Sequence, residues 1–480
     1  MSILSGIEPK NVFKYFEEIC TIPHGSGDME KISQYCMRFA GEQGLKAICD
    51  DAKNVVIYKD GTKGYEDAEP IILQGHLDMV CQKTDDSTVD FEKDGIEAYV
   101  EEGYVKAKKT TLGADNGIAA SMILTILASD DIVHPPIEAV FTTDEEVGMI
   151  GAGKMDISAL KGKKMINLDA EEEEFVTVSC AGGSDFRIFV PAERRSVNGR
   201  RVILKVKDLK GGHSGVEIDK GRVNANILMG RVLGHANRTL NFDVIRINGG
   251  NKGNAIPRSC EVEVVTDNAD GFAQEMTKYL SLIKREIDKR EPDFSFDIEK
   301  CEDGTFEVLT DENKEKMMYM LQISPDGIVK MSAEIDGLVE TSLNLGVVET
   351  RQNEIVMLYA LRSNKSTALD ALIEKLTVFA KYSGCGFETS GRYEPWEYKE
   401  NSHLRDLYVE TYAEMFGKKP EVAAIHAGLE CAVFAAAIDG LDCIAIGPDM
   451  FGVHTTEEKL SIESTQKIFN LLCKVLEKSK

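Results

Sequence analysis

Two histidines and several carboxylates stand where apolar runs of this sequence end. His76 and Asp78 lie in IILQGHLDMV, and His454 lies far away in MFGVHTTEE. Further acids follow other apolar or glycine-rich runs: Asp115 (TLGADNG), Glu145 and Glu146 (VFTTDEEVG), and Asp169 (MINLDAEEE). Imidazole nitrogens and carboxylate oxygens are ligands that divalent metal ions accept. The set predicts a hydrolase site with two metal ions and an activated water between them.

The spacing of His76 and Asp78 favours a shared role. Two residues apart on a strand, both side chains face the same way. His76 can then bind a metal while Asp78 accepts the proton of the second ring nitrogen or steadies a neighbouring ligand. Taken alone, the pair is better explained as a surface histidine and aspartate at a strand end.

The other acids also have two explanations each. Asp115 precedes an apolar helix, so it is either a helix N-cap or a carboxylate that bridges two cations. Glu145 and Glu146 are adjacent and point differently, so one can bind metal while the other acts as general base. A solvated acidic turn is the alternative for this pair. Asp169 is either a ligand or a strand-end cap.

The remaining histidines fall into two groups. His213 lies in a glycine-rich segment, GGHSG, from which it can reach a substrate. His426, in IHAGLE, precedes an apolar helix and can line the same cleft. Turn or surface positions are expected for the others: His24, His134, His235 and His403. The motifs GxSxG, GxxxxGK[ST] and HExxH do not occur in the sequence, which excludes three other enzyme classes.

Strands and helices alternate in the segments that must position these residues. Strand-like runs occur at 54–60, 69–79 and 137–145, and an apolar helix is expected at 117–130, between the last two. This alternation predicts an α/β fold with a largely parallel sheet. Sites of such sheets gather at the carboxyl ends of the strands, where the predicted ligands stand.

The chain of 480 residues is long enough for two domains. The pattern changes near residue 195, and 239–250 (TLNFDVIRINGG) resembles 342–353 (SLNLGVVETRQN). A strand and then a helix follow each copy. We therefore expect a catalytic domain formed by 1–195 and 388–480, and an inserted α+β domain at 196–387 with two tandem halves.

Charge and cysteine usage restrict the partners and the compartment. The net charge is −25, from 56 basic and 81 acidic residues, which excludes nucleic acid and anionic membranes as partners. Eleven cysteines without a CxxC pair predict reduced thiols in the cytoplasm. We see no signal peptide, and no apolar run approaches eighteen residues, so a membrane span is not expected.

In this order, GHLDMV, TLGADNG, TTDEEVG, NLDAEE and GVHTTEE resemble segments of the co-catalytic dizinc exopeptidases. That family contains carboxypeptidases, aminoacylases and dipeptidases with an inserted lid. The resemblance covers nearly the whole chain, and the combination is specific although each segment is weak. GGHSG, GNAIPR, LRSNKST and IHAGLECA look closest to the bacterial cytosolic aminoacyl-histidine dipeptidases of the family. The resemblance implies two ferredoxin-like halves in the lid.

The resemblance also implies a role for each metal-site residue. One metal ion would be held by His76, Asp115 and Asp169. The second would be held by Asp115, Glu146 and His454, with Asp115 bridging the two. Glu145 matches the general base, and Asp78 matches the residue that supports His76.

Substrate-binding residues are implied in the lid. His213 would contact the substrate and help to stabilise the oxyanion, Asn254 would contact the substrate, and Arg362 would bind its carboxylate. His426, expected in the same cleft, completes the set. Two arrangements stay open: His213 acts within its own chain, or it acts across a homodimer.

The implied activity is hydrolysis of the peptide bond of dipeptides, including Xaa-His dipeptides, with Glu145 as general base. The cofactors would be two divalent metal ions, Zn²⁺ first, with Co²⁺ and Mn²⁺ as alternatives. A related amidohydrolase that cleaves tripeptides or N-acyl amino acids is the second hypothesis. A catalytically inactive binding protein is the third. It should lack the base or a ligand, whereas all these positions are filled.

Overall fold

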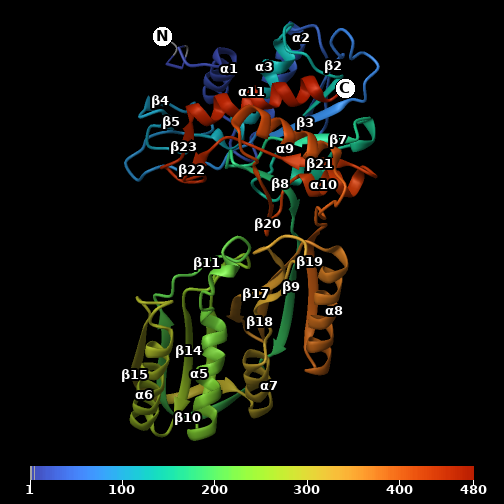
Figure 1. Cartoon of the computed structure of the whole chain (residues 1–480). Coiled ribbons are helices and arrows are strands. Elements are labelled where there is room, and N and C mark those ends of the chain that lie inside the picture. Colours follow the sequence, from blue (N-terminus) through green and yellow to red (C-terminus); the bar gives the residue numbers. More distant parts are fainter. Residues whose placement is uncertain (1–2, 5) are drawn as a thin grey trace. The chain divides into compact units, whose positions relative to one another are not determined.

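The structure is a computed structural model that describes residues 3–4 and 6–480, and it contains two compact units (Figure 1). Unit 1 contains the described residues up to Cys180, together with Trp396–Ala424 and Leu429–Lys480. Unit 2 contains Ala181–Pro395 and Ile425–Gly428. These limits differ from the expected boundaries at 195 and 387. The reason is that two strands near the boundaries, β9 (Gly182–Pro191) and β19 (Gly386–Tyr393), are hydrogen-bonded into the sheet of unit 2.

Unit 1 is built on an eight-stranded sheet with the order β1-β2-β6-β3-β7-β21-β8-β20. Its strands are β1 (Lys46–Cys49), β2 (Val55–Lys59), β3 (Ile71–His76), β6 (Ile137–Thr142), β7 (Lys164–Asn167), β8 (Phe175–Cys180), β20 (Glu421–Ile425) and β21 (Asp442–Ala445). The four central strands, β6, β3, β7 and β21, are parallel. Every residue of β3 and β6 is buried, as expected for strands covered on both faces. The predicted α/β fold is confirmed.

Helices cover this sheet. They are α1 (Lys10–Cys20), α2 (Glu30–Glu42), α3 (Ala114–Ala128), α4 (Ile150–Lys154), η1 (Ile157–Ala159), α9 (His403–Phe416), α10 (Cys431–Ala437) and α11 (Ile462–Lys478). Helix α3 contacts α1 and β3, and nearly all of its residues are buried. None of the helices in the described part of the chain has the length and apolarity that a membrane span requires.

A small antiparallel sheet completes unit 1. It has the order β22-β23-β5-β4 and consists of β22 (Met450–Phe451), β23 (Lys459–Ser461), β5 (Tyr104–Ala107) and β4 (Ala98–Glu101). The turn between β22 and β23 contains His454. The pairing of β23 with β5 therefore anchors the His454 turn to a segment of the first part of the chain.

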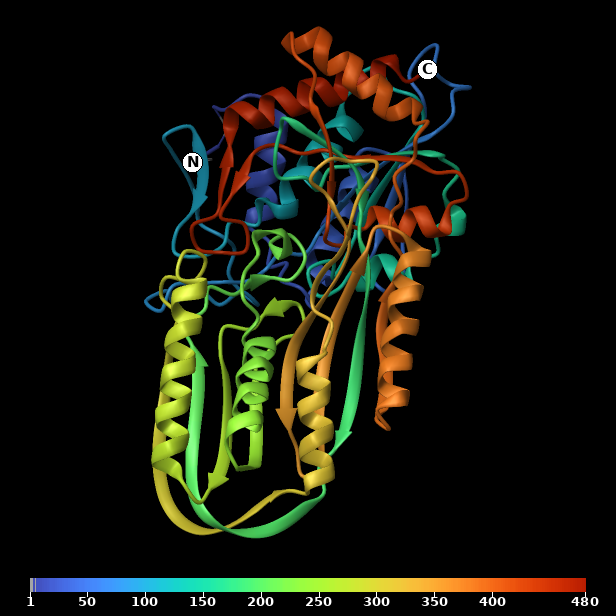
Figure 2. The same ribbon diagram turned by 60° about the horizontal axis from the view of Figure 1, so that its bottom comes forward.

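Unit 2 is a nine-stranded antiparallel sheet with four helices on one face, as Figure 2 shows. Besides β9 and β19, its strands are β10 (Arg194–Lys207), β12 (Asp243–Gly249), β14 (Cys260–Thr266), β15 (Ser295–Leu309), β16 (Gly327–Met331), β17 (Val339–Thr350) and β18 (Glu354–Ser363). The helices are α5 (Ala225–Thr239), α6 (Ala269–Ile287), α7 (Asp311–Gln322) and α8 (Ser366–Tyr382). Short elements lie at one end: β11 (Gly212–His213), β13 (Ala255–Ile256) and η2 (Ile218–Lys220).

The two halves of unit 2 have the same strand order but are not in tandem. The first half runs β10-α5-β12-β14-α6-β15, and the second runs β9-α7-β17-β18-α8-β19. In each half the fourth strand lies beside the first, and the third lies between the first and the second. This arrangement corresponds to the ferredoxin-like motif. Because β9 precedes the whole first half, the first half is nested within the second, and the expectation of tandem halves was wrong.

Candidate metal centre

The predicted ligands of unit 1 come from the ends of neighbouring parallel strands and from two turns. His76 is the last residue of β3, while Glu146 and Asp169 follow its neighbours β6 and β7. Asp115 lies in the first turn of α3, and His454 lies in the turn between β22 and β23. The carboxyl ends of adjacent parallel strands meet at one edge of the sheet, so the ligands converge there.

Asp115 lies between the two histidines. Its Oδ1 is 3.0 Å from Nε2 of His76, and its Oδ2 is 3.1 Å from Nε2 of His454. Glu146 Oε1 is 2.7 Å from the same His454 nitrogen, and Asp169 Oδ1 is 3.4 Å from Nε2 of His76. Ligand atoms of His76, Asp115 and Glu146 all lie within 4.8 Å of one another. One oxygen toward each imidazole is the placement that a bridging carboxylate needs.

The electrostatics of the cluster fit a bound cation. Burial opposes ionisation of Asp115, but hydrogen bonds from His454 and His76 outweigh it and hold the pKa of Asp115 below its ordinary value. The same bonds to Asp115 and Glu146 raise the pKa of His454 to about 10. The carboxylates thus stabilise positive charge at the two imidazoles. A divalent cation supplies such charge and displaces the imidazole protons when it binds.

Asp78 organises the turn that carries Glu145 and Glu146. Its carboxylate accepts hydrogen bonds from their backbone N–H groups at 2.9 and 3.2 Å and from the hydroxyl of Ser26 at 2.8 Å. The Nδ1 atom of His76 lies 3.0 Å from the Asp78 carbonyl oxygen and 3.5 Å from its Oδ1. Both partners are acceptors, so Nδ1 carries the proton and Nε2 is left to bind a metal.

Glu145 has a carboxylate without a hydrogen-bond donor among the described residues, whereas Glu146 contacts His454. Burial raises the pKa of Glu145 well above its ordinary value. The Asp169 carboxylate raises it further, while His76 acts in the opposite direction. A free carboxylate with a raised pKa has the properties of a general base near neutral pH.

Two buried carboxylates close to the candidate ligands were not predicted from the sequence. Glu430, just before α10, accepts hydrogen bonds from Gln74 Nε2 and Thr142 Oγ1, both at 2.5 Å. Burial raises the pKa of Glu430 to about 7. Glu458, just before β23, accepts hydrogen bonds from backbone N–H groups around Asp115. Both lie in segments whose histidines are predicted site residues, IHAGLE and GVHTTEE. An acid directly before an apolar run, CAVFAAAI, is a signal for Glu430, whereas Glu458 precedes Lys459 and has no such signal.

The guanidinium of Arg362 in unit 2 forms no ion pair with a carboxylate of the described residues. It lies near the end of β18, is only 9% exposed, and donates from Nη1 to the Tyr393 hydroxyl at 3.2 Å. Its Nε is buried without a partner in the described chain, and no described carboxylate lies within 4 Å of its guanidinium. A nearly buried guanidinium in this state is suited to bind an anionic group.

His213 is a neutral hydrogen-bond donor. Its Nδ1 accepts from the backbone N–H groups of Gly215 and Val216, both at 3.2 Å, so the ring proton is on Nε2. Burial lowers the pKa of His213 to about 4, and the positive charge of Arg362 contributes. The loop that contains His213 lies close to the Arg362 guanidinium: a Cβ at Gly215 would be 3.1 Å from Arg362 Nε.

The other two predicted substrate-binding residues differ in availability. Both ring nitrogens of His426 are engaged: Nε2 lies 2.7 Å from Ser342 Oγ, and Nδ1 lies 3.1 Å from Asn364 Oδ1. Direct contact with a substrate would require His426 to exchange one of these partners. Asn254 is exposed, and its carbonyl oxygen accepts the backbone N–H of Ser214 at 2.9 Å. Its side chain therefore lies on the surface of the loop that contacts the His213 segment.

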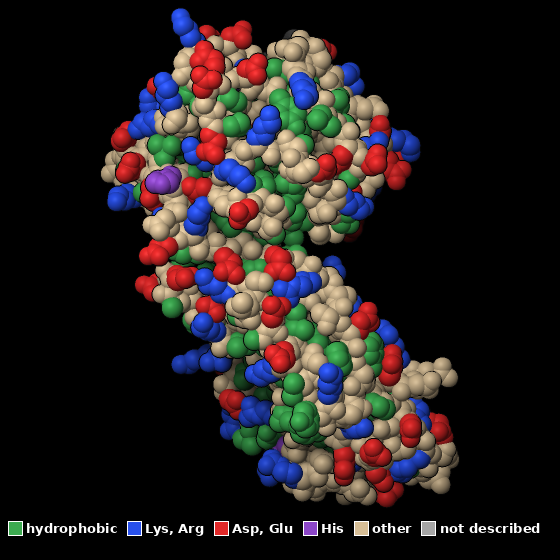
Figure 3. Space-filling view, turned by 90° about the vertical axis from the view of Figure 1, so that its right-hand side faces the viewer, with side chains coloured by type: hydrophobic (Ala, Val, Ile, Leu, Met, Phe, Trp, Pro, Cys, Tyr) green, Lys and Arg blue, Asp and Glu red, His purple; other side chains and the backbone are tan. Residues whose placement is uncertain are grey.

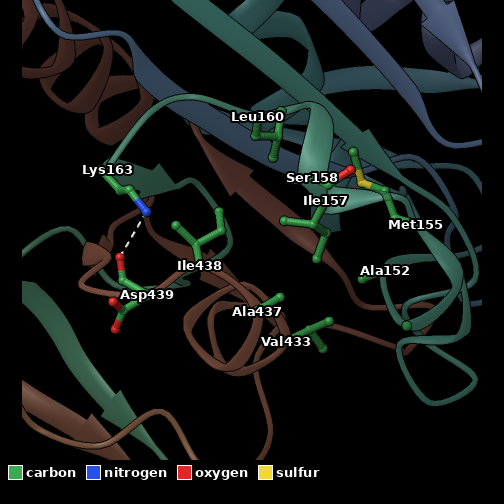
Figure 4. A pocket seen from close by; sticks show the side chains of 11 residues that line it. Ala152, Met155, Ile157, Ser158, Leu160, Lys163, Val433, Ala437, Ile438 and Asp439 are labelled. Atoms are coloured by element: carbon green, nitrogen blue, oxygen red, sulfur yellow. Dashed lines mark hydrogen bonds between the residues drawn. The ribbon is translucent and has the colours of Figure 1, made fainter.

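A pocket in another part of unit 1 lacks a comparable cluster of carboxylates and imidazoles among its lining residues. It has a volume of about 590 Å³ and lies between the α4–η1 segment and α10 (Figure 4). Its lining is mostly aliphatic, and Lys163 Nζ donates to the Asp439 carbonyl at 2.9 Å. On the face of the molecule shown in Figure 3, basic and acidic side chains are interspersed. The carboxylate–imidazole cluster is therefore the stronger candidate site.

Comparisons with known proteins identify the family of this chain. Residues 72–478 match Peptidase family M20/M25/M40. The chain is 36% identical to the cytosol non-specific dipeptidase of Escherichia coli (strain K12), over 99% of both chains. It is also similar to the crystal structure of aminoacylhistidine dipeptidase from Vibrio alginolyticus, with a TM-score of 0.89, 37% identity, and coverage of 99% of this chain and 98% of that one. Human carnosine dipeptidase 1 shares the fold, at a TM-score of 0.52 and 12% identity. The chain belongs to peptidase family M20/M25/M40.

Proposed function

We propose that this protein is a cytoplasmic metallo-dipeptidase that hydrolyses the peptide bond of dipeptides, with Xaa-His dipeptides among its substrates. The observation that carries the proposal is the position of Asp115, with one oxygen toward His76 and the other toward His454. The names of the two relatives with 36% and 37% identity support dipeptides as the substrate class. The homodimer expected from the sequence stays a prediction.

In this proposal two divalent cations occupy the cluster. His76, Asp115 and Asp169 would hold one, and Asp115, Glu146 and His454 would hold the other. When bound, such a pair lowers the pKa of a water molecule and polarises the carbonyl of the scissile bond. Zn²⁺ suits these nitrogen and oxygen ligands, and Co²⁺ and Mn²⁺ accept them as well.

The residues of the chain would move the proton and orient the substrate. Glu145 accepts a proton from the attacking water and delivers it to the leaving amine. Asp78 keeps Glu145 in place through the backbone bonds of the 145–146 turn. In unit 2, the Nε2–H of His213 would donate to the carbonyl oxygen, which becomes an oxyanion when water adds to the carbonyl carbon. Arg362 pairs with the free α-carboxylate and so limits the substrate to two residues.

We expect protein purified without chelator to contain two divalent metal ions per chain. It should cleave Xaa-His and other dipeptides but leave tripeptides and N-acetyl amino acids intact. Removal of the metal should abolish cleavage, and adding it back should restore activity. Elemental analysis combined with chromatography of the released amino acids tests this. Equal cleavage of tripeptides or N-acetyl amino acids would favour the amidohydrolase alternative.

Asp115→Asn should abolish binding of both cations and all activity, because the variant loses the bridging charge. If the residue had only a structural role, such as capping a helix, its replacement would lower the free energy of unfolding by about 1 kcal/mol and leave metal binding intact. Calorimetric titration of the stripped variant with Zn²⁺ distinguishes these cases. Normal binding of two ions would show that Asp115 is not a bridging ligand and that the proposed centre is wrong.

Glu145→Gln should keep both metal ions and lower kcat about 10²- to 10⁴-fold, because an amide cannot accept the proton of the water. The hydrogen bonds of the Glu145 backbone and the ligand set are unchanged in this variant. Metal content and kcat are measured on the same preparation. Full metal content together with a wild-type kcat would contradict the assignment of the base.

Arg362→Ala should raise KM for dipeptides strongly, and Arg362→Lys should recover only part of the loss, because an ammonium lacks the planar guanidinium geometry. Wild-type protein should prefer a free acid over the same dipeptide amide by about 2–5 kcal/mol. The Ala variant should show almost no preference. Arg258→Ala is the matched control, since the Nε of that exposed arginine already donates to the Leu209 carbonyl. An Arg362→Ala variant that retains the preference would exclude Arg362 as the carboxylate ligand.

A further inference from the structure

We propose that Glu458 is a positioning residue of the metal centre: its carboxylate fixes the turn that carries Asp115 relative to the turn that carries His454. This inference rests on the proposed function in so far as it concerns metal binding. Asp115 and His454 are 339 residues apart in the sequence. A single buried side chain therefore connects the turn of the proposed bridging ligand with the turn of His454, the more exposed of the two candidate imidazole ligands.

The Glu458 carboxylate accepts hydrogen bonds from four consecutive backbone N–H groups. Its Oε2 accepts from Leu112 at 2.6 Å and from Gly113 at 3.1 Å. Its Oε1 accepts from Ala114 at 2.8 Å and from Asp115 at 3.4 Å. Glu458 is only 3% exposed, so solvent does not compete for these donors. Charge-assisted bonds of this kind are stronger than neutral ones.

The turn before α3 depends on an external acceptor. The first N–H groups of a helix have no partner within the helix. The N-cap residue of α3 is Gly113, which has a φ of 71° and no side chain that could cap the helix. A Cβ at this position would lie 2.8 Å from Met79 Sδ, so a larger capping residue does not fit. The backbone of Asp115 and Asn116 is not helical, so the regular part of α3 begins after them, and Glu458 supplies the acceptor for the N–H groups of the preceding turn.

The other end of the connection is the His454 turn. The backbone N–H of Glu458 donates to the Thr455 carbonyl at 3.2 Å, and that of Thr455 donates to Gly452 at 3.1 Å. His454 itself has a φ of 64°, a left-handed conformation that a non-glycine residue adopts at a cost. The hydrogen bond from Thr455 to Gly452 spans His454 and closes the turn, and the bond from Glu458 to Thr455 continues the turn toward β23. Glu458 thus belongs to the His454 turn by its backbone and to the Asp115 turn by its side chain.

A simple helix-capping role predicts a loss of stability and nothing more. A positioning role predicts in addition that both cations bind more weakly, because Asp115 contributes to both sites. Replacement of a ligand that serves only one site, such as Asp169, should weaken mainly the binding of the cation at that site. Ligand atoms must be held within about 0.5 Å of their functional positions, so a small displacement of the Asp115 turn is sufficient to weaken metal binding.

The test is Glu458→Gln, titrated with Co²⁺ after metal stripping and followed by calorimetry. Its amide has one acceptor oxygen and places an NH₂ group against two of the four donors. We expect Co²⁺ affinity to fall about 10- to 100-fold at both sites in parallel. Glu458→Asp keeps the charge with a shorter side chain and should lose several-fold at both sites. If Glu458→Gln does not fold, the Asp variant decides.

Glu138→Gln is the matched control. Glu138 is 4% exposed and accepts backbone N–H bonds from Lys161 and Gly162 at 2.9 Å. It lies at the start of β6, whereas the candidate ligands follow the end of that strand. Both Gln variants should lower the thermal unfolding midpoint, but only Glu458→Gln should lower Co²⁺ affinity. Wild-type affinity in a folded Glu458 variant would overturn the positioning role. Failure of the wild-type protein to bind two Co²⁺ ions would instead contradict the proposed metal centre.

Discussion

The carboxylate of Asp115 has one oxygen toward each of two imidazoles, His76 and His454, and the proposed metal centre depends on this contact. One imidazole ends a central strand, and the other lies in a turn of a separate small sheet. The parallel sheet brings three ligand segments to one edge, because its strands run in the same direction. The small sheet and Glu458 hold the other two segments against them. If Asp115 bridges two cations, as proposed, it tolerates little movement, and its backbone is fixed from several sides.

Unit 2 presents a different chemistry on a different scaffold. Its nested ferredoxin-like halves form one continuous antiparallel sheet, so β18 is supported on both sides. Arg362 near the end of that strand is nearly buried and forms no ion pair with a described carboxylate, and the neutral His213 lies in a loop held by backbone bonds. Since His213 carries no charge, it can donate a hydrogen bond without competing with Arg362 for an anion. In the proposed function, residues of unit 1 bind the metal ions and transfer the proton, and residues of unit 2 bind the substrate.

The sequence by itself was sufficient to predict the α/β class and the membership of an exopeptidase family. Both depend on local signals: buried parallel strands appear as continuous apolar runs, and the ligands follow those runs within a few residues. His76, Glu146 and Asp169 could be selected because each stands at such a strand end. Asp115 could be selected as well, although one turn is consistent with both a helix cap and a bridging ligand.

Only the tertiary structure decided the contacts between segments that are distant in the sequence. The nesting of unit 2 depends on the pairing of β9 with β18, which no local pattern reveals. The partners of Asp78 and Glu458 are backbone N–H groups of remote turns, and backbone groups carry no residue-type signal. The engagement of both His426 nitrogens depends on remote partners in the same way. Residue types thus determined the chemistry that is available, while the chain topology determined which of these groups meet.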